Sequence, residues 1–448
     1  ESFGARLTLK MDDPALYAKD AEAIFQSLKI KQDLLKVTLR GILIGDKIYD
    51  TYLRMHNLST VDLKDERLLD IIRLALAIFH ASERYLEKTK VVAYFVDDPS
   101  YISSGILSRM MFAKNVPTYV SVWGSEFWLL RSHPATSPEE QLCPVSSTVH
   151  SHYMYPILFS RLSDGEKEAG ILKGREALEK RLSGAHCPFI QMPKSPYANG
   201  ENTDAPAGPI LANHNGRPKI LVMLHDFIDC PHSYRHMLFP DFKEWITFLL
   251  EKAEKTPFSW YVKPHPFASS SSRKVINAVN SQIIEDLKKQ FPKVTFIPGT
   301  ANNQQILKEG ISSLFTVHGT VAHEFAYCGV PVVNAGDNPH SEYNFNFHAK
   351  TIEEYTQFIE NADKLKIEID KTKIEEFAYM NYFYFQERFG SRTSLVDISE
   401  LTDEEKGQIT VNSEIYPKLL SGITPDKEQH LQKYLKRYFE ELESKQNR

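Results

Sequence analysis

The chain has 448 residues, which exceeds one typical domain and indicates two or three. Its 42% apolar and 25% charged residues are ordinary for a soluble globular enzyme, and a net charge of −5 without a basic stripe argues against a nucleic-acid partner. No apolar run approaches the ~20 residues that span a bilayer, and the N-terminus does not read as a signal peptide. The cysteines show neither metal nor redox spacing, so a reducing, cytoplasmic location is expected: Cys143, Cys187, Cys230 and Cys328.

The first half of the chain alternates helical and strand-like patterns. Helical patterns cover residues 14–39, 67–88 and 105–114, strand-like patterns cover 90–96 and 117–122, and a short strand or turn is expected at 41–45. A strand, a helix and a strand joined by short connections form a βαβ unit, so the sheet should be parallel. We predict an N-terminal α/β domain at residues 1–187, which would bind the acceptor.

Residues 188–217 are rich in Pro, Gly, Asn and Ala and predict a linker. A second doubly wound α/β domain is expected at residues 218–380. Its predicted strands and helices alternate in chain order: strands 219–224, 259–262, 294–297 and 314–317, and helices 242–255, 272–291, 303–309 and 321–327.

Residues 381–448 are predicted to be a helical extension. Thr424 and Pro425 suit a helix start, and the apolar stripe that follows predicts a helix packed on its own protein. The alternatives are a homo-oligomer contact or a peripheral contact with the inner face of a membrane, and the glutamates of this helix weaken the membrane alternative. The stripe consists of Leu431, Tyr434, Leu435, Tyr438, Phe439 and Leu442.

Two strand-to-helix corners in the second half carry groups that suit an anion. The first is Lys263-Pro264-His265-Pro266, where the flanking prolines restrict the backbone around His265 and Lys263 adds a positive charge on the same face. The alternative for this motif alone is an ordinary strand end capped by prolines with a surface histidine. Open α/β sheets bind ligands beyond the carboxyl ends of their strands, so a phosphate or carboxylate is expected here.

The second corner is His318-Gly319-Thr320, directly before a predicted helix. Glycine lets the backbone approach a ligand closely, Thr320 can cap the helix, and the helix N-terminus favours a phosphate. Glu324 lies one turn further on and is placed to accept hydrogen bonds from ribose hydroxyls, although a surface glutamate is the simpler alternative.

Two more loops follow strands at the same edge of the sheet. The loop from Asn334 to His340 directly follows a strand, and its Asn338 and His340 are candidates for contacts with the sugar or the base. The alternative is a simple turn. The loop after the strand at 219–224 contains Asp226 and Asp229, and sugar transfer needs a carboxylate or imidazole near the anomeric carbon.

Metal ligation is not the preferred interpretation of the histidine pairs. His232 and His236 are four residues apart and His150 and His152 are two apart, but no third ligand stands at a convincing interval from either pair. No metal site and no cofactor are therefore expected.

In the first half, polar residues mixed with aromatic ones follow the predicted strands. Asp50, Asp98 and Glu126 are the candidates for contacts with a carbohydrate acceptor, since aromatic rings stack on sugar faces. Taken singly, each is as well explained by a solvated carboxylate.

These motifs together resemble GT-B glycosyltransferases of bacterial surface-polysaccharide assembly, which have two Rossmann-like domains facing a cleft. The similarity is greatest to the retaining β-Kdo transferases of capsule synthesis, and it rests on Lys263-Pro264-His265-Pro266 and on the Gly319-Thr320 corner with Glu324. It implies a CMP-sugar donor such as CMP-Kdo, with His265 and Gly319-Thr320 at its phosphate and Glu324 at its ribose. It also implies an aspartate nucleophile in the cleft, for which Asp229 is the first match and Asp226 the second.

The predicted partners are thus a nucleotide-sugar donor and a glycan or glycolipid acceptor. A UDP-sugar or GDP-sugar donor fits the same corners. A phosphotransferase that uses a CDP-polyol and a binding module without catalysis are the alternatives from other functional classes.

Overall fold

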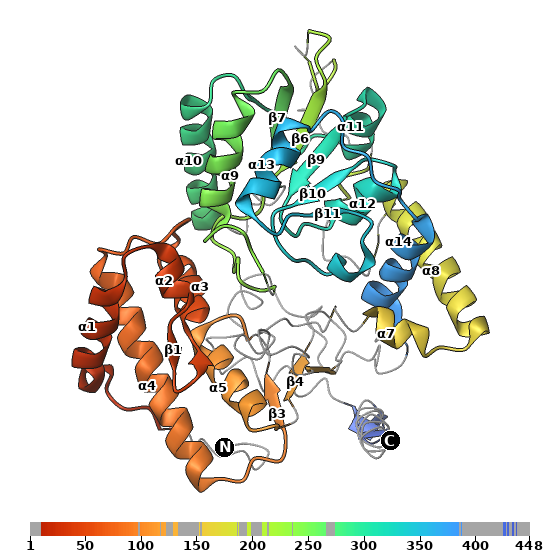
Figure 1. Ribbon diagram of the computed structural model, residues 1–448. Helices are drawn as coiled ribbons and strands as arrows, with labels where there is room; N and C mark the ends of the chain where they lie inside the picture. Colours follow the sequence, from red (N-terminus) through yellow and green to blue (C-terminus); the bar gives the residue numbers. More distant parts are fainter. Residues whose placement is uncertain are drawn as a thin grey trace.

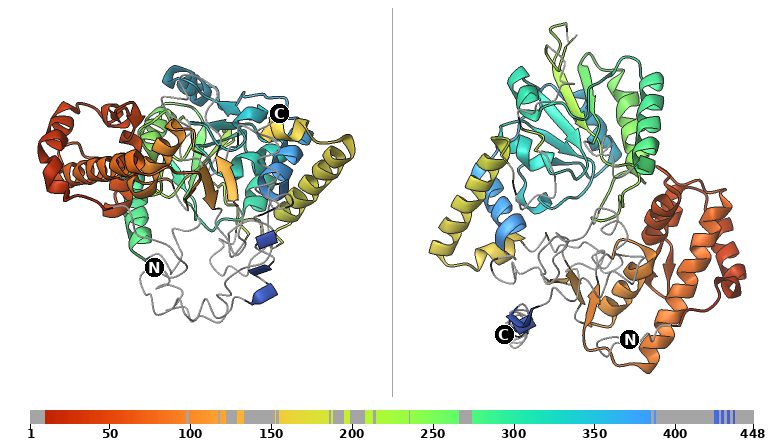
Figure 2. Two further views of the ribbon diagram at one scale, coloured as in Figure 1. Left: turned by 90° about the horizontal axis from the view of Figure 1, so that it is seen from below. Right: turned by 180° about the vertical axis from the view of Figure 1, so that it is seen from behind.

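The computed structural model describes residues 10–96, 99–116, 118–121, 129–132, 152, 155–185, 187, 195–198, 208–212, 215–234, 236–265, 274–384 and 387, with eight more residues between 424 and 436. Asp98, Glu126 and the apolar stripe predicted for the C-terminal helix lie outside these residues. The chain forms two units that lie side by side (Figures 1 and 2). None of the described helices combines the length and the apolar character needed to cross a membrane.

The N-terminal unit packs helices around its own hydrophobic core. Its elements are η2 (Pro14–Tyr17), α1 (Ala18–Ser27), α2 (Lys31–Leu35), β1 (Thr38–Leu39), β2 (Ile42–Leu43), α3 (Gly45–His56), α4 (Glu66–Lys88), β3 (Tyr94–Val96), α5 (Ile102–Ala113), β4 (Thr118–Ser121) and β5 (Leu129–Ser132). Strands β3 and β4 pair in parallel, as expected from the βαβ pattern, whereas β5 joins β4 antiparallel.

The helix predicted at residues 14–39 is broken into shorter elements. Asp33 causes one of the breaks, because its carboxylate accepts the backbone N–H groups of Lys29 and Ile30 and so starts α2 separately from α1. Arg40 and Gly41 then take positive φ values of 50° and 80°, which form the tight turn between β1 and β2.

The C-terminal unit is a six-stranded, all-parallel sheet with helices on both faces. Its elements are α7 (Tyr155–Ser160), α8 (Asp164–Leu182), β6 (Lys219–Met223), α9 (Phe242–Ala253), β7 (Ser259–Lys263), α10 (Lys274–Gln290), β8 (Thr295–Phe296), α11 (Asn303–Glu309), β9 (Ser313–Thr316), α12 (Val321–Tyr327), β10 (Val332–Asn334), η6 (Ser341–Tyr343), β11 (Phe347–His348), α13 (Ile352–Glu360), α14 (Lys371–Tyr379) and η7 (Met380–Tyr384). The strand order β11-β10-β9-β6-β7-β8 is that of a Rossmann fold. The predicted α/β fold class is confirmed.

Alternate residues of the central strands enter two separate cores. Leu221 and Met223 of β6 pack with α7, α8, α12 and α14, whereas Ile220 and Val222 pack with α9, α10 and α13. Burial on both faces explains why these strands read as continuous apolar runs in the sequence.

Helices α7 and α8 lie within residues 1–187 of the sequence and pack on the C-terminal unit. Their apolar side chains join the core of the C-terminal unit, and α8 packs directly on α14. Gly174 makes this approach possible, because a Cβ atom at that position would lie 1.9 Å from the carbonyl oxygen of Glu375. Arg175 and Glu375 add a pair of hydrogen bonds of 2.9 and 3.0 Å across the same contact.

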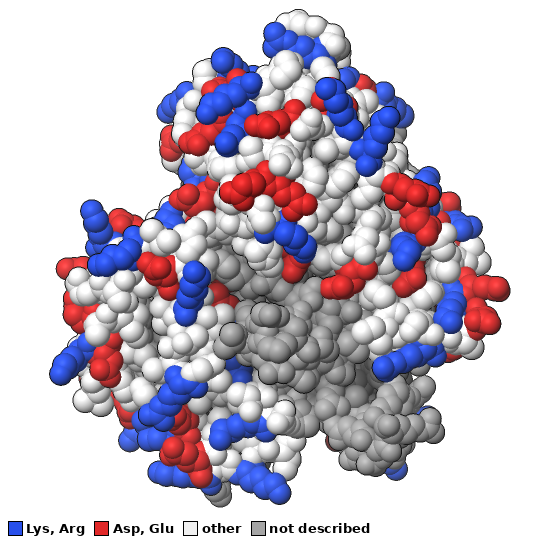
Figure 3. All heavy atoms as spheres, in the orientation of Figure 1, with Lys and Arg blue, Asp and Glu red and all other residues white. Residues whose placement is uncertain are grey.

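Charges of both signs are mixed on the described surface. On the face shown in Figure 3, Lys and Arg side chains alternate with Asp and Glu rather than forming a single-sign patch. The charge distribution of this face therefore does not resemble a nucleic-acid footprint.

Candidate active site

The candidate site lies where the strand order of the sheet reverses. Connections leave β6 toward one side of the sheet and β9 toward the other, so a crevice opens beyond the carboxyl ends of these neighbouring strands. A pocket occupies that position. It is lined by residues that follow β6, β7 and β9 and by residues of α8 and α11: Arg181, Pro196, Met223, Leu224, His225, Lys263, Pro264, His265, Asn303, Thr316, Gly319, Thr320 and Val321.

The two corners predicted from the sequence meet in this pocket. Lys263 and His265 come from the end of β7, and Gly319 and Thr320 precede α12. The pocket has a volume of about 90 Å³. Complete ligand pockets usually enclose about 300–1,000 Å³, so this one suits a single group such as a phosphate.

Lys263 is a buried cation without an anionic partner. Its side chain is 3% exposed, and its ammonium group donates to Asn303 Oδ1, which is neutral. No carboxylate lies within salt-bridge distance of it among the described residues. Burial disfavours the charged form and lowers the pKa of Lys263 to about 7.

The Gly319–Thr320 corner is tight and lacks the expected hydroxyl cap. A Cβ atom at Gly319 would lie 3.3 Å from Val321 and 3.4 Å from the His225 ring, so glycine fits this approach best. Thr320 is the N-cap residue of α12, but its side chain makes no capping hydrogen bond. The start of α12 therefore borders the pocket without a side-chain acceptor.

The imidazole of His225 accepts hydrogen bonds from the backbone of this corner. Its Nε2 lies 3.3 Å from the backbone nitrogens of Val317 and His318, so it accepts hydrogen bonds and must be unprotonated there. Burial lowers the pKa of His225 well below its usual value, which agrees with that role. The ring also stacks on Phe242 at a centroid distance of 4.6 Å.

Glu324 binds protein groups in this structure. It is fully buried, its Oε1 accepts from Arg181 Nε at 2.9 Å, and its Oε2 accepts from the Tyr197 hydroxyl at 2.7 Å. Arg181 comes from α8 and lines the pocket, so Glu324 orients a second cation there. The ribose contact expected for Glu324 stays a prediction.

Asn338 and His340 are buried beside the pocket residues and do not line it. The backbone N–H of Asn338 donates to the Ser341 hydroxyl oxygen at 2.9 Å, and His340 is 2% exposed between Phe345 and Phe377. The loop thus folds on itself, and its predicted contact with the donor is not seen in the pocket described above.

The two candidate nucleophiles differ in their surroundings. Asp226 is buried and accepts from Asn280 Nδ2 at 2.9 Å, which anchors the loop after β6. Asp229 is exposed, and its Oδ1 accepts from the neighbouring Cys230 N–H at 3.1 Å. Asp229 is therefore the more accessible of the two carboxylates.

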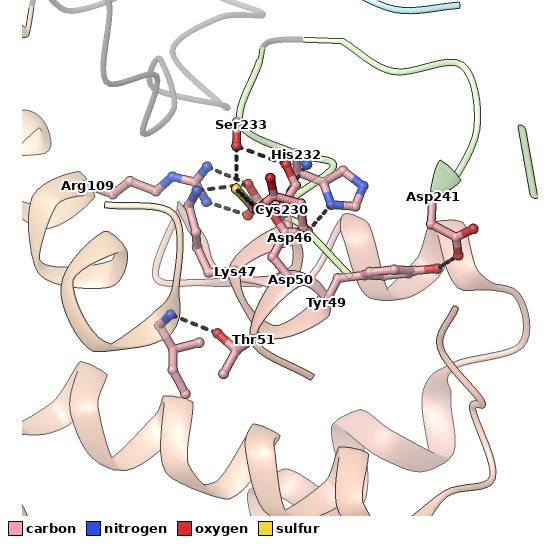
Figure 4. Close-up of polar contacts among 12 residues, drawn as sticks. Asp46, Lys47, Tyr49, Asp50, Thr51, Arg109, Cys230, His232, Ser233 and Asp241 are labelled. Atoms are coloured by element: carbon pink, nitrogen blue, oxygen red, sulfur yellow. Dashed lines mark hydrogen bonds and ion pairs between the residues drawn. The ribbon is translucent and has the colours of Figure 1, made fainter. Parts of the chain in front are cut away.

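Asp50 lies on α3 rather than in a loop after a strand. Its carboxylate contacts His232, which follows Asp229 in the same loop of the C-terminal unit (Figure 4). Asp241 forms a second link between the units by accepting from Thr60 at 2.6 Å and from Tyr49 at 2.5 Å. The predicted acceptor role of Asp50 remains untested, but Asp50 does lie at the junction of the two units.

Several site residues were not identified from the sequence. Arg181 lies in a segment assigned to the other domain, and Asn303 begins a helix with no motif around it. His225 and His232 belong to a loop that was singled out, but their partners come from distant parts of the chain. No three His, Cys, Asp or Glu residues in the described part of the chain are arranged to hold a metal ion.

Comparisons with known proteins give only distant likenesses. No protein-family model matches the chain. No curated protein sequence matches it either. Among solved structures it is similar to Thermosulfurimonas dismutans KpsC, a beta Kdo 2,4 transferase, at 12% identity and a TM-score of 0.34, with 62% of this chain and 76% of that chain covered.

Two further structures are similar at the same level. One is Thermosulfurimonas dismutans KpsC, beta Kdo 2,7 transferase, at 11% identity and a TM-score of 0.34. The other is the Methanocaldococcus jannaschii UDP-GlcNAc 2-epimerase in complex with UDP-GlcNAc and UDP, at 12% identity and a TM-score of 0.29. The first covers 67% of this chain and 80% of that chain, and the second covers 68% and 79%. Likenesses this distant assign neither a family nor a function to the chain.

Proposed function

We propose that this protein is a glycosyltransferase that moves a sugar from a nucleotide donor to a glycan or glycolipid acceptor. The observation that carries the proposal is Lys263, a buried amine that forms no salt bridge with any described residue, in a pocket at the switch point of a Rossmann-like sheet. An isolated buried charge is unfavourable, and an anion bound in the pocket removes that cost.

A donor phosphate fits this pocket chemically. Lys263 and His265 would face it from the end of β7, Arg181 from α8, and the backbone of Gly319 and Thr320 from the start of α12. These donors would stabilise the negative charge that develops on the leaving phosphate as the bond to the sugar breaks. Closure of the two units over the site would exclude water and so limit hydrolysis of the donor.

Asp229 is the proposed nucleophile, with Asp226 second. The order is supported by accessibility, because Asp229 is exposed whereas Asp226 is engaged by Asn280. The resemblance of the Lys263–Pro266 motif suggests CMP-Kdo as the donor and a surface polysaccharide as the product. A UDP-sugar or GDP-sugar donor, and a CDP-polyol phosphotransferase, remain outcomes of the test.

The test is a thermal-shift panel with CMP, UDP, GDP and CDP on the wild type, Lys263→Met and the exposed-lysine control Lys293→Met. A ligand at 100 times its Kd stabilises the folded state by ~2.7 kcal/mol. Selective stabilisation by CMP that is lost in Lys263→Met and kept in Lys293→Met would support a CMP-sugar donor. Selective stabilisation by UDP or GDP would replace CMP-Kdo with a UDP-sugar or a GDP-sugar as the proposed donor. No stabilisation by any of the four nucleotides would refute the proposed glycosyltransferase function.

A CDP response needs a second measurement, because a polyol donor leaves a different product. Phosphorus NMR of the product distinguishes the two reactions, since a phosphotransferase leaves a phosphodiester and a glycosyltransferase leaves none.

A further inference from the structure

A histidine and an aspartate from different units form a hydrogen-bonded pair. His232 lies in the loop after β6, and Asp50 lies on α3 (Figure 4). Asp50 Oδ1 is 2.5 Å from His232 Nδ1, and Asp50 Oδ2 accepts the backbone N–H of His232 at 3.2 Å. Because a carboxylate only accepts, Nδ1 carries the proton and the Nε2 lone pair of the neutral ring is left for another group.

The other charges on α3 leave Asp50 available for His232. Asp46, one helical turn before Asp50, is paired with Arg109 of α5 through an Nη2–Oδ2 distance of 2.6 Å. Lys47 Nζ lies 3.9 Å from Asp46 Oδ2. Asp46 raises and Lys47 lowers the pKa of His232, and Asp50 acts on it more strongly than either.

Three further titratable groups described near His232 are uncharged at neutral pH. The edge of the Tyr49 ring packs against His232 at a centroid distance of 5.1 Å, and burial raises the pKa of Tyr49 well above its usual value. Burial raises the pKa of the Cys230 thiol in the same loop to about 12, and it lowers the pKa of His318 to about 3. Among the described residues, Asp50 is thus the decisive charge facing His232.

His232 has one ring nitrogen without a partner. Nε2 is enclosed by the protein and makes no hydrogen bond with any described residue. In Figure 4 it points away from Asp50 and meets none of the drawn side chains. A buried polar atom left unpaired is unfavourable, so the site is complete only with a hydrogen-bonding group from outside the described residues.

We infer that His232 is the general base that accepts the proton of the acceptor hydroxyl at Nε2, and that Asp50 positions it. This inference rests on the proposed function. In the transfer step the acceptor O–H bond breaks and its proton goes to Nε2, while the oxygen forms a bond to the anomeric carbon of the sugar. The bond from that carbon to the Asp229 oxygen, which formed when Asp229 displaced the donor phosphate, breaks, and the electron pair stays on the Asp229 carboxylate.

Asp50 supports the step through the imidazole. It holds the Nδ1–H tautomer and stabilises the imidazolium that forms. Burial lowers the pKa of His232, but the attraction of Asp50 outweighs it and the pKa is raised overall. The base is therefore active above this raised pKa and is lost by protonation as the pH falls through it.

The pair is assembled from both units, which couples it to their closure. Asp50 belongs to the N-terminal unit and His232 to the C-terminal unit, so separation of the units would remove the partner of Nδ1. Since Nε2 is enclosed when the pair is formed, the acceptor binds before closure.

The test compares the wild type with His232→Gln, Asp50→Asn and the control His56→Gln. His56 is an imidazole on the same helix as Asp50 and packs on Tyr52, away from the pair. We would measure CMP affinity by calorimetry, Tm, and kcat over a pH series for nucleotide release from CMP-Kdo, UDP-GlcNAc and GDP-mannose with lipopolysaccharide-derived oligosaccharides.

The expected result is a fall in kcat of about 10²–10⁴-fold in His232→Gln with CMP affinity and Tm retained. Asp50→Asn should lower kcat and shift its acidic limb to lower pH, since loss of the carboxylate lowers the pKa of His232, and His56→Gln should match the wild type. Equal kcat in His232→Gln and the wild type would overturn the assignment of His232 as the base and leave the proposed function standing. An unshifted acidic limb of the kcat–pH profile in Asp50→Asn would do the same. Absence of CMP binding and of nucleotide release in the wild type would overturn the proposed function and this inference together.

If His232→Gln loses Tm, His232→Gly with added imidazole replaces it. Rescue of turnover by imidazole would support the assignment, because a purely structural role is not restored by a soluble base. Failure of rescue together with an unshifted limb in Asp50→Asn would count against it.

Discussion

Replacement of Lys263 by methionine should make the ligand-free protein more stable while removing its anion site. Methionine fills a similar volume without a charge. The pKa of Lys263 falls from 10.5 to about 7 on folding, so at pH 7 the unfolded chain binds a proton that the folded chain holds only half of the time. This difference destabilises the folded wild type by ~4 kcal/mol at pH 7.

Part of that gain is offset in the variant. Asn303 Oδ1 loses its buried donor when Lys263 is replaced, at a cost of ~1–3 kcal/mol. The net stabilisation of Lys263→Met at pH 7 is therefore expected to be ~1–3 kcal/mol relative to the wild type.

The pH dependence of this difference supplies the sharper check. The depressed pKa makes the cost of Lys263 fully present below pH 7, and the cost disappears as the pH rises toward the unfolded value of 10.5. Between pH 7 and pH 9 the wild type should therefore gain ~2 kcal/mol relative to Lys263→Met. Chemical denaturation of both proteins and of Lys293→Met at the two pH values measures it. A pH-independent difference, or a Lys263→Met variant less stable than Lys293→Met at pH 7, would refute the reasoning.

Three further variants test other parts of the structure. Glu324→Ala should cost ~3–5 kcal/mol in thermal denaturation, because it leaves the buried Arg181 guanidinium without its carboxylate, and an unchanged Tm would contradict the assigned pair. Gly174→Val should prevent the α8–α14 contact and lower Tm strongly, whereas Gly165→Val, where a Cβ meets nothing within 4 Å, should have a much smaller effect on Tm. Asp229→Ala should abolish sugar transfer with CMP affinity retained, and normal turnover would remove Asp229 as the nucleophile.

Local sequence signals predicted the C-terminal sheet well. The bounds of α11 and α12 agree with the helices predicted at 303–309 and 321–327, and β6, β7 and β9 lie within one or two residues of their predicted ranges. These elements are continuous apolar strands and short helices between clear turn residues, so their patterns depend on nearby residues only.

The N-terminal unit was harder to predict because side-chain hydrogen bonds override its helical pattern. Asp33 divides residues 14–39 by accepting hydrogen bonds from backbone N–H groups. The spacing of apolar residues at the helical period of 3.6 does not reveal such a break. The packing of α8 was not predicted for a similar reason. The apolar face of α8 does not show which core it joins, and its contacts with distant α14 at Gly174 and Arg175 determine this.

The candidate site shows the same division between local and distant information. The sequence predicted that Lys263, His265 and Gly319 lie at one edge of the sheet, because each stands at or just after the carboxyl end of a parallel strand. The three residues do line one pocket. It could not show that Glu324 binds Arg181, 143 residues away, because such pairs depend on the tertiary packing of α8.

The central claim is that an anionic group of the donor binds at Lys263, and proton uptake on binding tests it most directly. At pH 7.5 a lysine with a pKa of about 7 is mostly neutral, and an anion beside it restores the charge, so binding should take up ~0.8 proton. Titration calorimetry of CMP in buffers with different ionisation enthalpies measures this number. The account predicts uptake near that value in the wild type and in Lys293→Met, and loss of binding in Lys263→Met. Binding of CMP without proton uptake, or with equal affinity in Lys263→Met, would contradict it.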